Sequence, residues 1–421
     1  MTGLPVTRAD VDAAAAALAG ELWVTPSSVS ERLSQTTGAR VVVKLENLHA
    51  TGSFKERGAL TKLLQLGEPE RARGVIAHSA GNHGQALAYH GTRLGIPVTI
   101  VMPASTPTVK VERTKELGAA VLLVEGGVEA AETRAHEIAR DEHRVFVHPF
   151  DDPVVIAGQG TVALELVHEF PDLDAVIVPV GGGGLISGMA VALHDHHHGA
   201  VVPAEGRVEI VGVQTERYPS MVAARTGRDL PCGGSTIAEG IAVAHAGVNT
   251  AAIVRALVDD VVAVSESSIE EALNLLLFEE KTVTEGAGAA PLAALLEHRD
   301  RFAGRTVGLV LSGGNVDPRI LSQVVLRGLV RDGLLVTLEL VLPDAPGTLA
   351  AVAAVIGATG ANIVEVSHHR LFDDVAIKSA VLDLAVETRG RAHVDAIVAA
   401  LRDAGYAVHV RGSQLPERGS L

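Results

Sequence analysis

The chain has 421 residues, of which 47% are hydrophobic, and this length predicts two or three domains. A formal net charge of −15 at pH 7 argues against nucleic acid or an anionic membrane as the main partner. The single cysteine cannot form an internal disulfide, and no uninterrupted apolar stretch is long enough to span a membrane. The N-terminus lacks the basic and apolar segments of a signal peptide, so we expect a cytoplasmic protein.

Valine-rich runs alternate with stretches of helical spacing, the pattern typical of a parallel sheet covered by helices on both faces. We expect the first helix at Asp10–Ala19, with Asp10 as its N-cap. The later strands are predicted at Val41–Leu45, Gly74–His78, Pro97–Met102, Ala120–Val124, Arg144–His148, Asp174–Val180, Val208–Val213, Asp260–Val264 and Thr306–Leu311. Helices are predicted between them at Glu56–Leu66, from Gly84 to Leu94, and at Thr108–Leu117, Val128–Asp141, Pro153–Phe170, Leu185–His194 and Ser267–Glu280, with a last one ending near Val330. The alternation predicts an α/β domain with two lobes.

The pattern changes after Arg331–Gly333. Strands and helices then follow in the order βαββαβ, which is the order of a small ferredoxin-like module. The predicted elements are Leu334–Leu342, Thr348–Ala358, Asn362–Arg370, Ala376–Val386, Arg391–Ala404 and Tyr406–Val410. We therefore expect a first domain over residues 1–330 and a second over residues 331–421.

Lys55 stands at the predicted start of the helix that follows Val41–Leu45, directly after Phe54. A helix start is electropositive, and a neighbouring aromatic ring removes water, so both push a lysine toward its neutral amine. A free lysine titrates near ~10.4 and is a poor base or nucleophile at neutral pH. The alternatives are a reactive lysine and an ordinary solvated one.

Three glycine-rich loops follow three predicted strands, which we place in one sheet, so their loops should meet at its carboxyl edge. Gly181–Gly184 offers consecutive amides at a helix start, which suits a phosphate group. It is neither a Walker loop nor a dinucleotide fingerprint, because no Gly-Lys-Ser/Thr follows and Val208–Val213 leads to Gln214 instead of an acid.

The other two loops are Ser79–Gly84 and Ser312–Asn315. We expect free amides at Ser79, Gly81, Asn82 and His83, which could hold a carboxylate. Asn82 is either an ordinary helix cap or a hydrogen-bond donor to a ring hydroxyl. Ser312 either caps the next helix or faces a heteroaromatic nitrogen.

Taken together, these segments resemble the family of pyridoxal 5'-phosphate enzymes that includes threonine dehydratase. The matching stretches are Gly52–Ala59, Ser79–Gln85, Gly181–Leu185, Glu239–Val243 and Ser312–Asn315, in the family's order. The resemblance implies the two-lobed α/β fold of type II, with mostly parallel twisted sheets and a small lobe over about residues 54–150. It also implies that Lys55 binds the cofactor aldehyde covalently and that Phe54 packs beside the ring. The remaining implied contacts are the phosphate with Gly181, Gly182, Gly183, Gly184 and Leu185, the ring nitrogen with Ser312, and the 3'-oxygen with Asn82.

The same resemblance implies a substrate-carboxylate site made by Ser79, Ala80, Gly81, Asn82 and His83. Gly240 and Glu285 would line the pocket, although Glu285 could equally be an exposed residue at a helix start. The implied reaction converts L-threonine, and more weakly L-serine, to a keto acid and ammonia, in isoleucine biosynthesis or threonine catabolism. The alternatives are a serine racemase or serine dehydratase, a non-catalytic amino-acid sensor, and a nicotinamide dehydrogenase. The dehydrogenase would need an acidic residue after Val208–Val213, where this sequence has Gln214.

The C-terminal module resembles an ACT regulatory domain on Pro343–Leu349 and Gly360–Ile363. The resemblance implies an amino-acid site with Asp344, Gly347, Asn362 and Ile363, held between paired copies in a homodimer or homotetramer. Isoleucine or valine is the implied effector; the alternative is a module that only mediates oligomerisation. We expect no metal site, because His194 and His196–His198 end a helix in a charged stretch.

Overall fold

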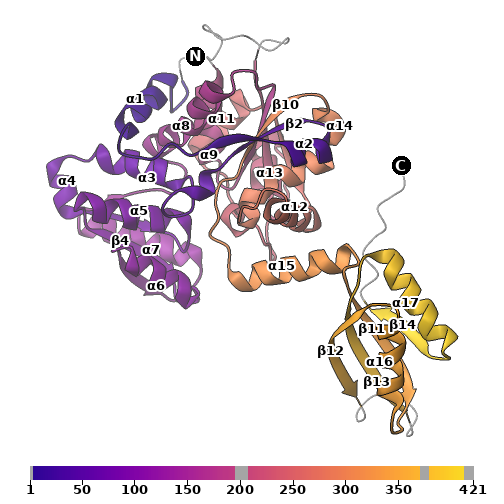
Figure 1. Cartoon of the computed structure of the whole chain (residues 1–421). Helices are drawn as coiled ribbons and strands as arrows, with labels where there is room; N and C mark the ends of the chain where they lie inside the picture. Colours follow the sequence, from indigo (N-terminus) through magenta and orange to yellow (C-terminus); the bar gives the residue numbers. More distant parts are fainter. Residues whose placement is uncertain (1–2, 195–206, 370–378, 412–421) are drawn as a thin grey trace. The chain divides into compact units, whose positions relative to one another are not determined.

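The structure is a computed structural model that describes residues 3–194, 207–369 and 379–411. The chain divides into two compact units, Met1–Asp317 and Pro318–Leu421 (Figure 1). The division precedes helix α15 (Pro318–Arg331), whereas the predicted domain boundary follows that helix.

The larger sheet of the first unit has six strands in the order β1-β2-β10-β7-β8-β9. All neighbouring pairs are parallel except β1 and β2. Their bounds are β1 Ser27–Ser30, β2 Arg40–Lys44, β7 Ala175–Pro179, β8 Glu209–Thr215, β9 Asp260–Val264 and β10 Thr306–Val310. The central strand β7 is buried along its whole length, which explains its continuous apolar run.

Helices cover both faces of this sheet. On one face Val176 and Val178 share a hydrophobic core with residues of α8 and α9, and α13 contacts β7, β8, β9 and β10. The helices of this lobe are α1 Arg8–Leu18, α2 Glu31–Thr37, α8 Pro153–Glu169, α9 Gly184–His194, α10 Ser220–Thr226, α11 Val248–Leu257, α12 Glu266–Phe278, α13 Gly286–Glu297 and α14 Arg299–Phe302, with 3-10 turns η1 Glu46–Leu48 and η2 Glu239–Ile241.

The smaller sheet of the first unit is parallel and has the order β5-β4-β3-β6. Residues of α3 and α5 share one hydrophobic core with it, and residues of α7 share another that includes Ile76 and Val101. The bounds are β3 Val75–His78, β4 Val98–Pro103, β5 Ala120–Val124, β6 Val145–Phe146, α3 Lys55–Leu64, α4 Glu68–Arg73, α5 Asn82–Leu94, α6 Thr108–Glu116 and α7 Val128–Asp141.

Helices α3 and α8 cross at a pair of glycines. A Cβ atom on Gly158 would lie 2.8 Å from the Cα of Gly58, and one on Gly58 would lie 2.8 Å from the carbonyl oxygen of Val155. Only residues without a side chain permit this backbone approach. The crossing fixes α3, which begins with Lys55, against the helix that covers the larger sheet.

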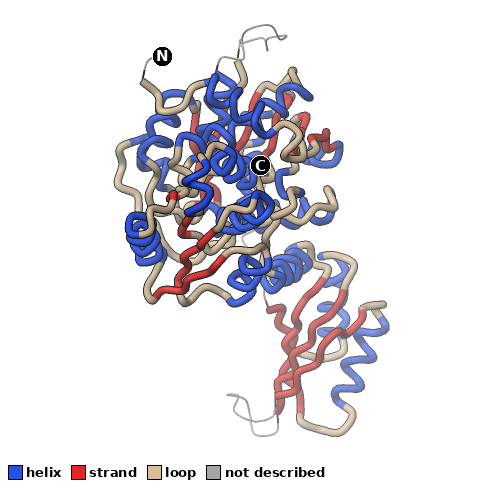
Figure 2. Tube along the Cα trace, turned by 90° about the vertical axis from the view of Figure 1, so that its left-hand side faces the viewer, coloured by secondary structure: helices blue, strands red, loops and turns tan. Residues whose placement is uncertain are grey.

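The second unit contains a four-stranded antiparallel sheet in the order β12-β13-β11-β14. Helices α16 and α17 share one hydrophobic core with the sheet and lie on the same face of it (Figure 2). The bounds are β11 Leu335–Pro343, α16 Thr348–Ala358, β12 Asn362–His369, β13 Ser379–Glu387, α17 Arg391–Asp403 and β14 Ala407–Arg411. The predicted order βαββαβ is therefore confirmed.

Two sequence-based expectations about the first unit are wrong. The N-cap of α1 is Thr7, because the Thr7 hydroxyl accepts from the Asp10 amide while the Asp10 carboxylate accepts from the Thr7 amide. The three glycine-rich loops do not follow strands of one sheet, since β3 lies in the smaller sheet and β7 and β10 in the larger one.

Candidate active site

The segment before Lys55 is bonded to the loop that follows β10. Ser53 and Gly313 form an antiparallel bridge, and the Phe54 amide donates to the Ser312 carbonyl at 3.1 Å. The Gly314 amide donates to the Gly52 carbonyl at 2.9 Å. These backbone bonds bring the Lys55 and Ser312 segments, which are far apart in the sequence, to the same place.

Lys55 is the first residue of α3 and is half-buried. Its Nζ donates to the Pro149 carbonyl at 2.6 Å and lies 5.0 Å from the centre of the Phe54 ring. Burial lowers the pKa of Lys55 to about 8, although the negative charge of the nearby Glu285 carboxylate raises it. A neutral amine is therefore accessible close to physiological pH.

The Gly181–Gly184 loop follows β7 and leads into α9. Gly183 has φ +98°, and a Cβ on it would lie 2.5 Å from the Met221 Cε. A Cβ on Gly182 would lie 2.3 Å from the ring of Phe150. In the described part of the chain the amides of Gly181–Leu185 have no hydrogen-bond acceptor. This row of unpaired amides at a helix start fits a phosphate group.

Pro149 and Phe150 connect the lysine to the glycine loop. The Pro149 carbonyl accepts from Lys55 Nζ, while the next residue packs its ring and backbone against Gly182 and Gly184. The Lys55 amine and the glycine loop are therefore held by two consecutive residues. The residues present fit pyridoxal 5'-phosphate, which carries an aldehyde and a phosphate.

The loop between β3 and α5 offers fewer free amides than expected. The Ser79 amide donates to the Val101 carbonyl at 3.2 Å, and the Gly81 amide donates to Ser79 Oγ at 3.2 Å. One amide is therefore used by the neighbouring strand β4 and the other by the serine side chain of the same loop. Of the four expected donors, Asn82 and His83 keep amides without an acceptor among the described residues.

The side chain of Asn82 meets Glu285, which occupies the N-cap position of α13. Asn82 Nδ2 donates to Glu285 Oε1 at 2.8 Å. A Cβ on Gly240 would lie 2.9 Å from the same oxygen, and one on Gly313 would lie 2.6 Å from it. Burial raises the pKa of Glu285 to about 7, although the bond from Asn82 lowers it. Glu285 therefore lies beside Gly240 and Asn82, and the exposed alternative does not hold.

Two further predicted residues are buried next to this group. The ring of His83 is hydrogen-bonded to the Val147 carbonyl at 3.0 Å. Burial is the main cause that holds the pKa of His83 well below its usual range, and the positive charge of Lys55 is the next. His83 is therefore neutral. Ser312 is 2% exposed, and its hydroxyl has no hydrogen-bond partner within the described residues, so it is available to a ligand.

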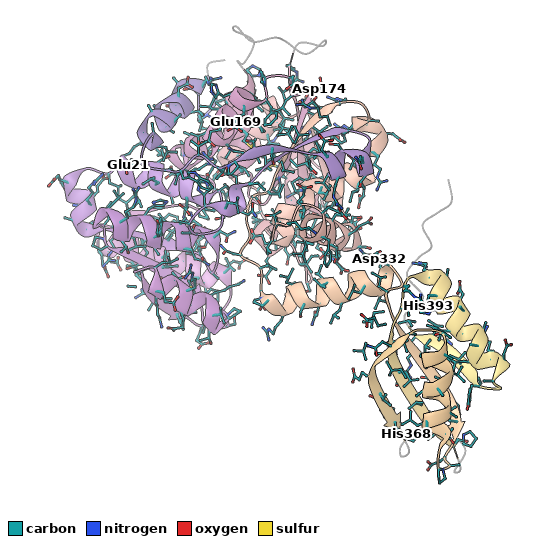
Figure 3. The ribbon with its side chains drawn as sticks, in the orientation of Figure 1. Glu21, Glu169, Asp174, Asp332, His368 and His393 are labelled. Carbon is teal, nitrogen blue, oxygen red and sulfur yellow. The ribbon has the colours of Figure 1, made fainter. Side chains whose placement is uncertain are left out.

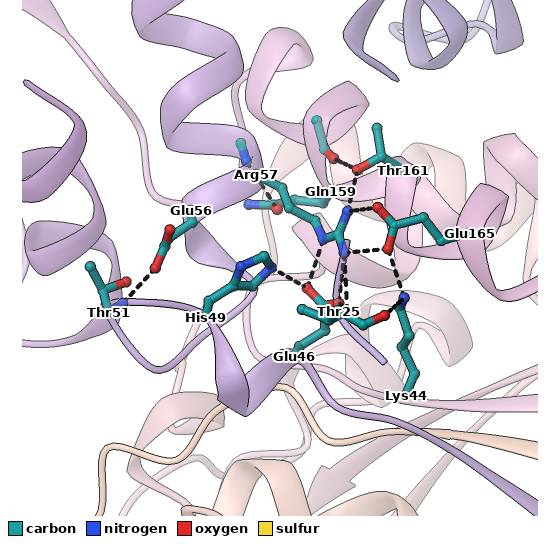
Figure 4. Close-up of polar contacts among 12 residues, drawn as sticks. Thr25, Lys44, Glu46, His49, Thr51, Glu56, Arg57, Gln159, Thr161 and Glu165 are labelled. Atoms are coloured by element: carbon teal, nitrogen blue, oxygen red, sulfur yellow. Dashed lines mark hydrogen bonds and ion pairs between the residues drawn. The ribbon is translucent and has the colours of Figure 1, made fainter. Parts of the chain in front are cut away.

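A buried ionic network surrounds Arg57, two residues after Lys55, and was not predicted (Figure 4). Arg57 donates to both oxygens of Glu46 at 2.7 and 2.8 Å and to both oxygens of Glu165 at 2.6 Å. Lys44 Nζ donates to Glu165 at 2.6 Å. Burial opposes the charge of Arg57, but the two carboxylates raise its pKa. The network ties α3 to β2 and α8.

The comparisons define the class of protein to which this fold and site belong. Residues 18–313 match the family described as pyridoxal-phosphate dependent enzyme, and the chain belongs to that family. Pyridoxal 5'-phosphate is therefore its cofactor, and the predicted two-lobed fold of type II is confirmed.

Three similar proteins define the likeness within this family. The chain is 42% identical over 409 residues to an L-threonine ammonia-lyase of Thermotoga maritima, covering 97% of this chain and 100% of the relative. It is 37% identical to the solved threonine deaminase of T.th., with a TM-score of 0.68, covering 74% of this chain and 99% of the other. It is 31% identical to the solved maize serine racemase, with a TM-score of 0.70, covering 78% of this chain and 99% of the other.

The second unit contains a cavity of about 340 Å³ at the loop between β11 and α16. Asp344 and Gly347 line it, and Gly347 has φ +88° at the N-cap of α16. His368, labelled in Figure 3, also lines it. Asn362 and Ile363 stand at the start of β12 and do not line this cavity, so the predicted regulatory residues are not gathered within one copy.

The described residues also bear on membrane-spanning helices and metal-binding groups. No helix within residues 3–194, 207–369 and 379–411 is long and apolar enough to cross a membrane. The same residues contain no group of three or more His, Cys, Asp or Glu side chains arranged for a metal ion. His196–His198 lie outside the described residues.

Proposed function

We propose that this chain is an L-threonine ammonia-lyase that converts L-threonine to 2-oxobutanoate and ammonia, and L-serine to its keto acid more slowly. The observation that carries the proposal is the position of Lys55, whose amine is bonded to Pro149 beside the acceptor-free amides of Gly181–Leu185. The full-length likeness to the Thermotoga enzyme supports L-threonine as the substrate.

Bound pyridoxal phosphate supplies an aldehyde for the substrate amine and a ring that accepts electron density from the α-carbon. Lys55 holds that aldehyde in the resting enzyme and removes the α-proton once its amine is free. A pKa of about 8 supplies enough neutral amine for this step. The β-hydroxyl leaves as water, with its proton supplied by the Lys55 amine that has taken up the α-proton. Water then releases the amino group as ammonia.

Asn82, His83 and Ser312 orient the reacting groups in this proposal. The amides of Asn82 and His83 hold the substrate carboxylate, at the start of α5 where the helix dipole favours negative charge. The Asn82 side chain would donate to the ring 3'-oxygen of the bound cofactor with the amide proton that Glu285 does not use. The neutral hydroxyl of Ser312 would face the ring nitrogen of the bound cofactor and leave it unprotonated, which would favour elimination over transamination.

We further propose that the second unit is an ACT-like domain that binds isoleucine or valine and controls the activity in a cytoplasmic homodimer or homotetramer. A cavity of about 340 Å³ beside Asp344 and Gly347 is large enough for a branched amino acid. Asn362 and Ile363 would complete the site from a paired copy. A flat calorimetric titration of the full chain with both amino acids would remove this part of the proposal.

A serine racemase or serine dehydratase is the second candidate, favoured by the fold similarity to maize serine racemase. Formation of D-serine from L-serine, measured beside keto-acid release from L-threonine and L-serine, separates these activities. A non-catalytic sensor would release no keto acid, although the intact Lys55 site argues against it.

The decisive experiment combines labelling with an assay. Purified protein incubated with pyridoxal phosphate and reduced with borohydride should carry the label on Lys55 and release 2-oxobutanoate before reduction. Lys55→Ala should stay colourless and inactive, whereas the control Lys115→Ala, an exposed lysine on α6, should behave like the parent. A label on another lysine contradicts the proposal.

A further inference from the structure

Asn315 uses both protons of its side-chain amide within the first unit. Its Nδ2 donates to the Thr51 carbonyl at 2.7 Å and to Asn82 Oδ1 at 2.8 Å. Both acceptors are oxygens that can only accept, so the opposite orientation of the amide would place its oxygen against two oxygens. The orientation of Asn315 is therefore determined by its neighbours.

Glycine at position 52 leaves the space that Asn315 needs. Gly52 has φ +75°, and a Cβ there would lie 2.8 Å from Asn315 Oδ1 and 3.3 Å from its Nδ2. A side chain at this position would displace Asn315 and strain the backbone. The glycine and the asparagine therefore form one arrangement.

Buried groups anchor the acceptor side of this arrangement. The Thr51 amide donates to the carboxylate of Glu56, which is 1% exposed and also binds the ring of His90 at 3.0 Å. The Thr51 carbonyl is thereby held in a fixed place, so Asn315 is fixed with it. Asn315 itself is exposed, and exposed hydrogen bonds contribute little to folding stability.

The orientation of Asn82 follows from that of Asn315. Because Asn82 Oδ1 accepts from Asn315, its Nδ2 must face the other way, where it donates to Glu285 at 2.8 Å. One proton of that nitrogen remains, which is the proton that the proposed function assigns to the ring 3'-oxygen. A reversed Asn82 would present an acceptor to that oxygen.

We propose that Asn315 is a positioning residue, which holds the Asn82 amide with its nitrogen toward the cofactor and has no contact with substrate. This inference depends on the proposed role of Asn82. It predicts that loss of Asn315 weakens cofactor binding through Asn82 alone.

A double-mutant cycle on the full chain tests this. The cofactor dissociation constant is measured by spectral titration of the apoprotein for the parent, Asn315→Ala, Asn82→Ala and the double variant. Asn315→Ala should raise the constant about fivefold, roughly the effect of one neutral hydrogen bond. In the Asn82→Ala background it should have no further effect. The visible band of bound cofactor in Asn315→Ala should shift toward that of Asn82→Ala. The melting temperature of the apoprotein should be unchanged.

Asn47 supplies a matched control. Its Nδ2 likewise donates twice, to Thr282 Oγ1 and to the Val283 carbonyl, both at 3.0 Å, and neither bond involves Asn82. Asn47→Ala should lower stability and leave the absorbance band unchanged. An equal effect of Asn315→Ala in both backgrounds, or no effect in the parent, overturns the inference. Failure of the proposed function appears instead as a parent protein that releases no keto acid.

Discussion

The ring of Phe150 occupies the space that a side chain at Gly182 would need. A Cβ on Gly182 would lie 2.3 Å from that ring, far inside van der Waals contact. The ring cannot move away easily, since its own backbone packs against Gly184 and its neighbour Pro149 binds Lys55. The phosphate loop and the lysine are thus held by the same two residues.

Gly182→Ala should therefore weaken cofactor binding. Overpacking by one methyl group costs about 1–3 kcal/mol, so the dissociation constant should rise roughly 5- to 150-fold. Spectral titration of the apoprotein measures it. The matched control is Gly127→Ala at the N-cap of α7, where a Cβ meets nothing within 4 Å and the constant should not change.

The stability of the apoprotein should depend on pH through Glu285. Its pKa is about 7 in the folded chain against 4.5 in the unfolded one, so the folded state binds more protons between these values. Stability therefore falls as pH rises from 4.5 to 7, and the loss remains above that range. Glu285→Gln should be more stable than the parent at pH 8, by about 3 kcal/mol, and equal to it below pH 4.5.

Thermal unfolding at pH 4.5, 6 and 8 checks the effect of Glu285→Gln. The exposed carboxylate Glu137, which pairs with Arg134 on α7, provides the control Glu137→Gln. A constant difference between Glu285→Gln and the parent at every pH would show that burial of the carboxylate is not the cause.

Removal of one member of the buried network should be severe. Arg57→Met leaves Glu46 and Glu165 without their shared partner, and an uncompensated buried charge costs about 3–5 kcal/mol. Denaturant unfolding of the apoprotein measures the loss. Arg134→Met, which breaks an exposed pair, should change stability by less than about 1 kcal/mol. Similar losses of stability for both variants would contradict the large contribution that the buried network is expected to make.

Ser312→Asp should change the products of the reaction. A carboxylate beside the ring nitrogen keeps that nitrogen protonated, which strengthens the ring as an electron acceptor and favours transamination. The fraction of substrate that is transaminated should rise relative to the keto acid and ammonia released. Ser312→Ala, which adds no charge, is the control. An unchanged product ratio in Ser312→Asp would refute the role given to the neutral hydroxyl.

Much of the site could be predicted because its glycines mark places where the backbone approaches other atoms. The segments around Lys55, Gly181 and Ser312 were recognisable for this reason. The assignment of the Ser79–Gly84 loop to the same sheet as the other two glycine-rich loops failed, because the apolar pattern of β3 shows that it is buried but does not identify its neighbouring strands. The Gly81 amide is used because a serine side chain can bond its own loop, and the Ser79 amide is used because it bonds the neighbouring strand β4 at Val101.

Two features could not be predicted from local patterns. Helix α13 is apolar on every side, contains Pro291 and begins with glycines, so it has no amphipathic period to identify it. Lysine and arginine are rarely buried completely, and only the long-range pairing with Glu165 explains the burial of Lys44 and Arg57. The charged residues beside the Lys55 motif were the available signal.

The crossing of α3 and α8 predicts how the chain tolerates sequence change. Because the Cα of Gly58 lies within 2.8 Å of where a Cβ on Gly158 would stand, neither position accepts even a methyl group. Selection of active clones from a library randomised at both codons should return glycine at each. Redesign of substrate preference must therefore begin at the loops and leave this contact between the lobes untouched.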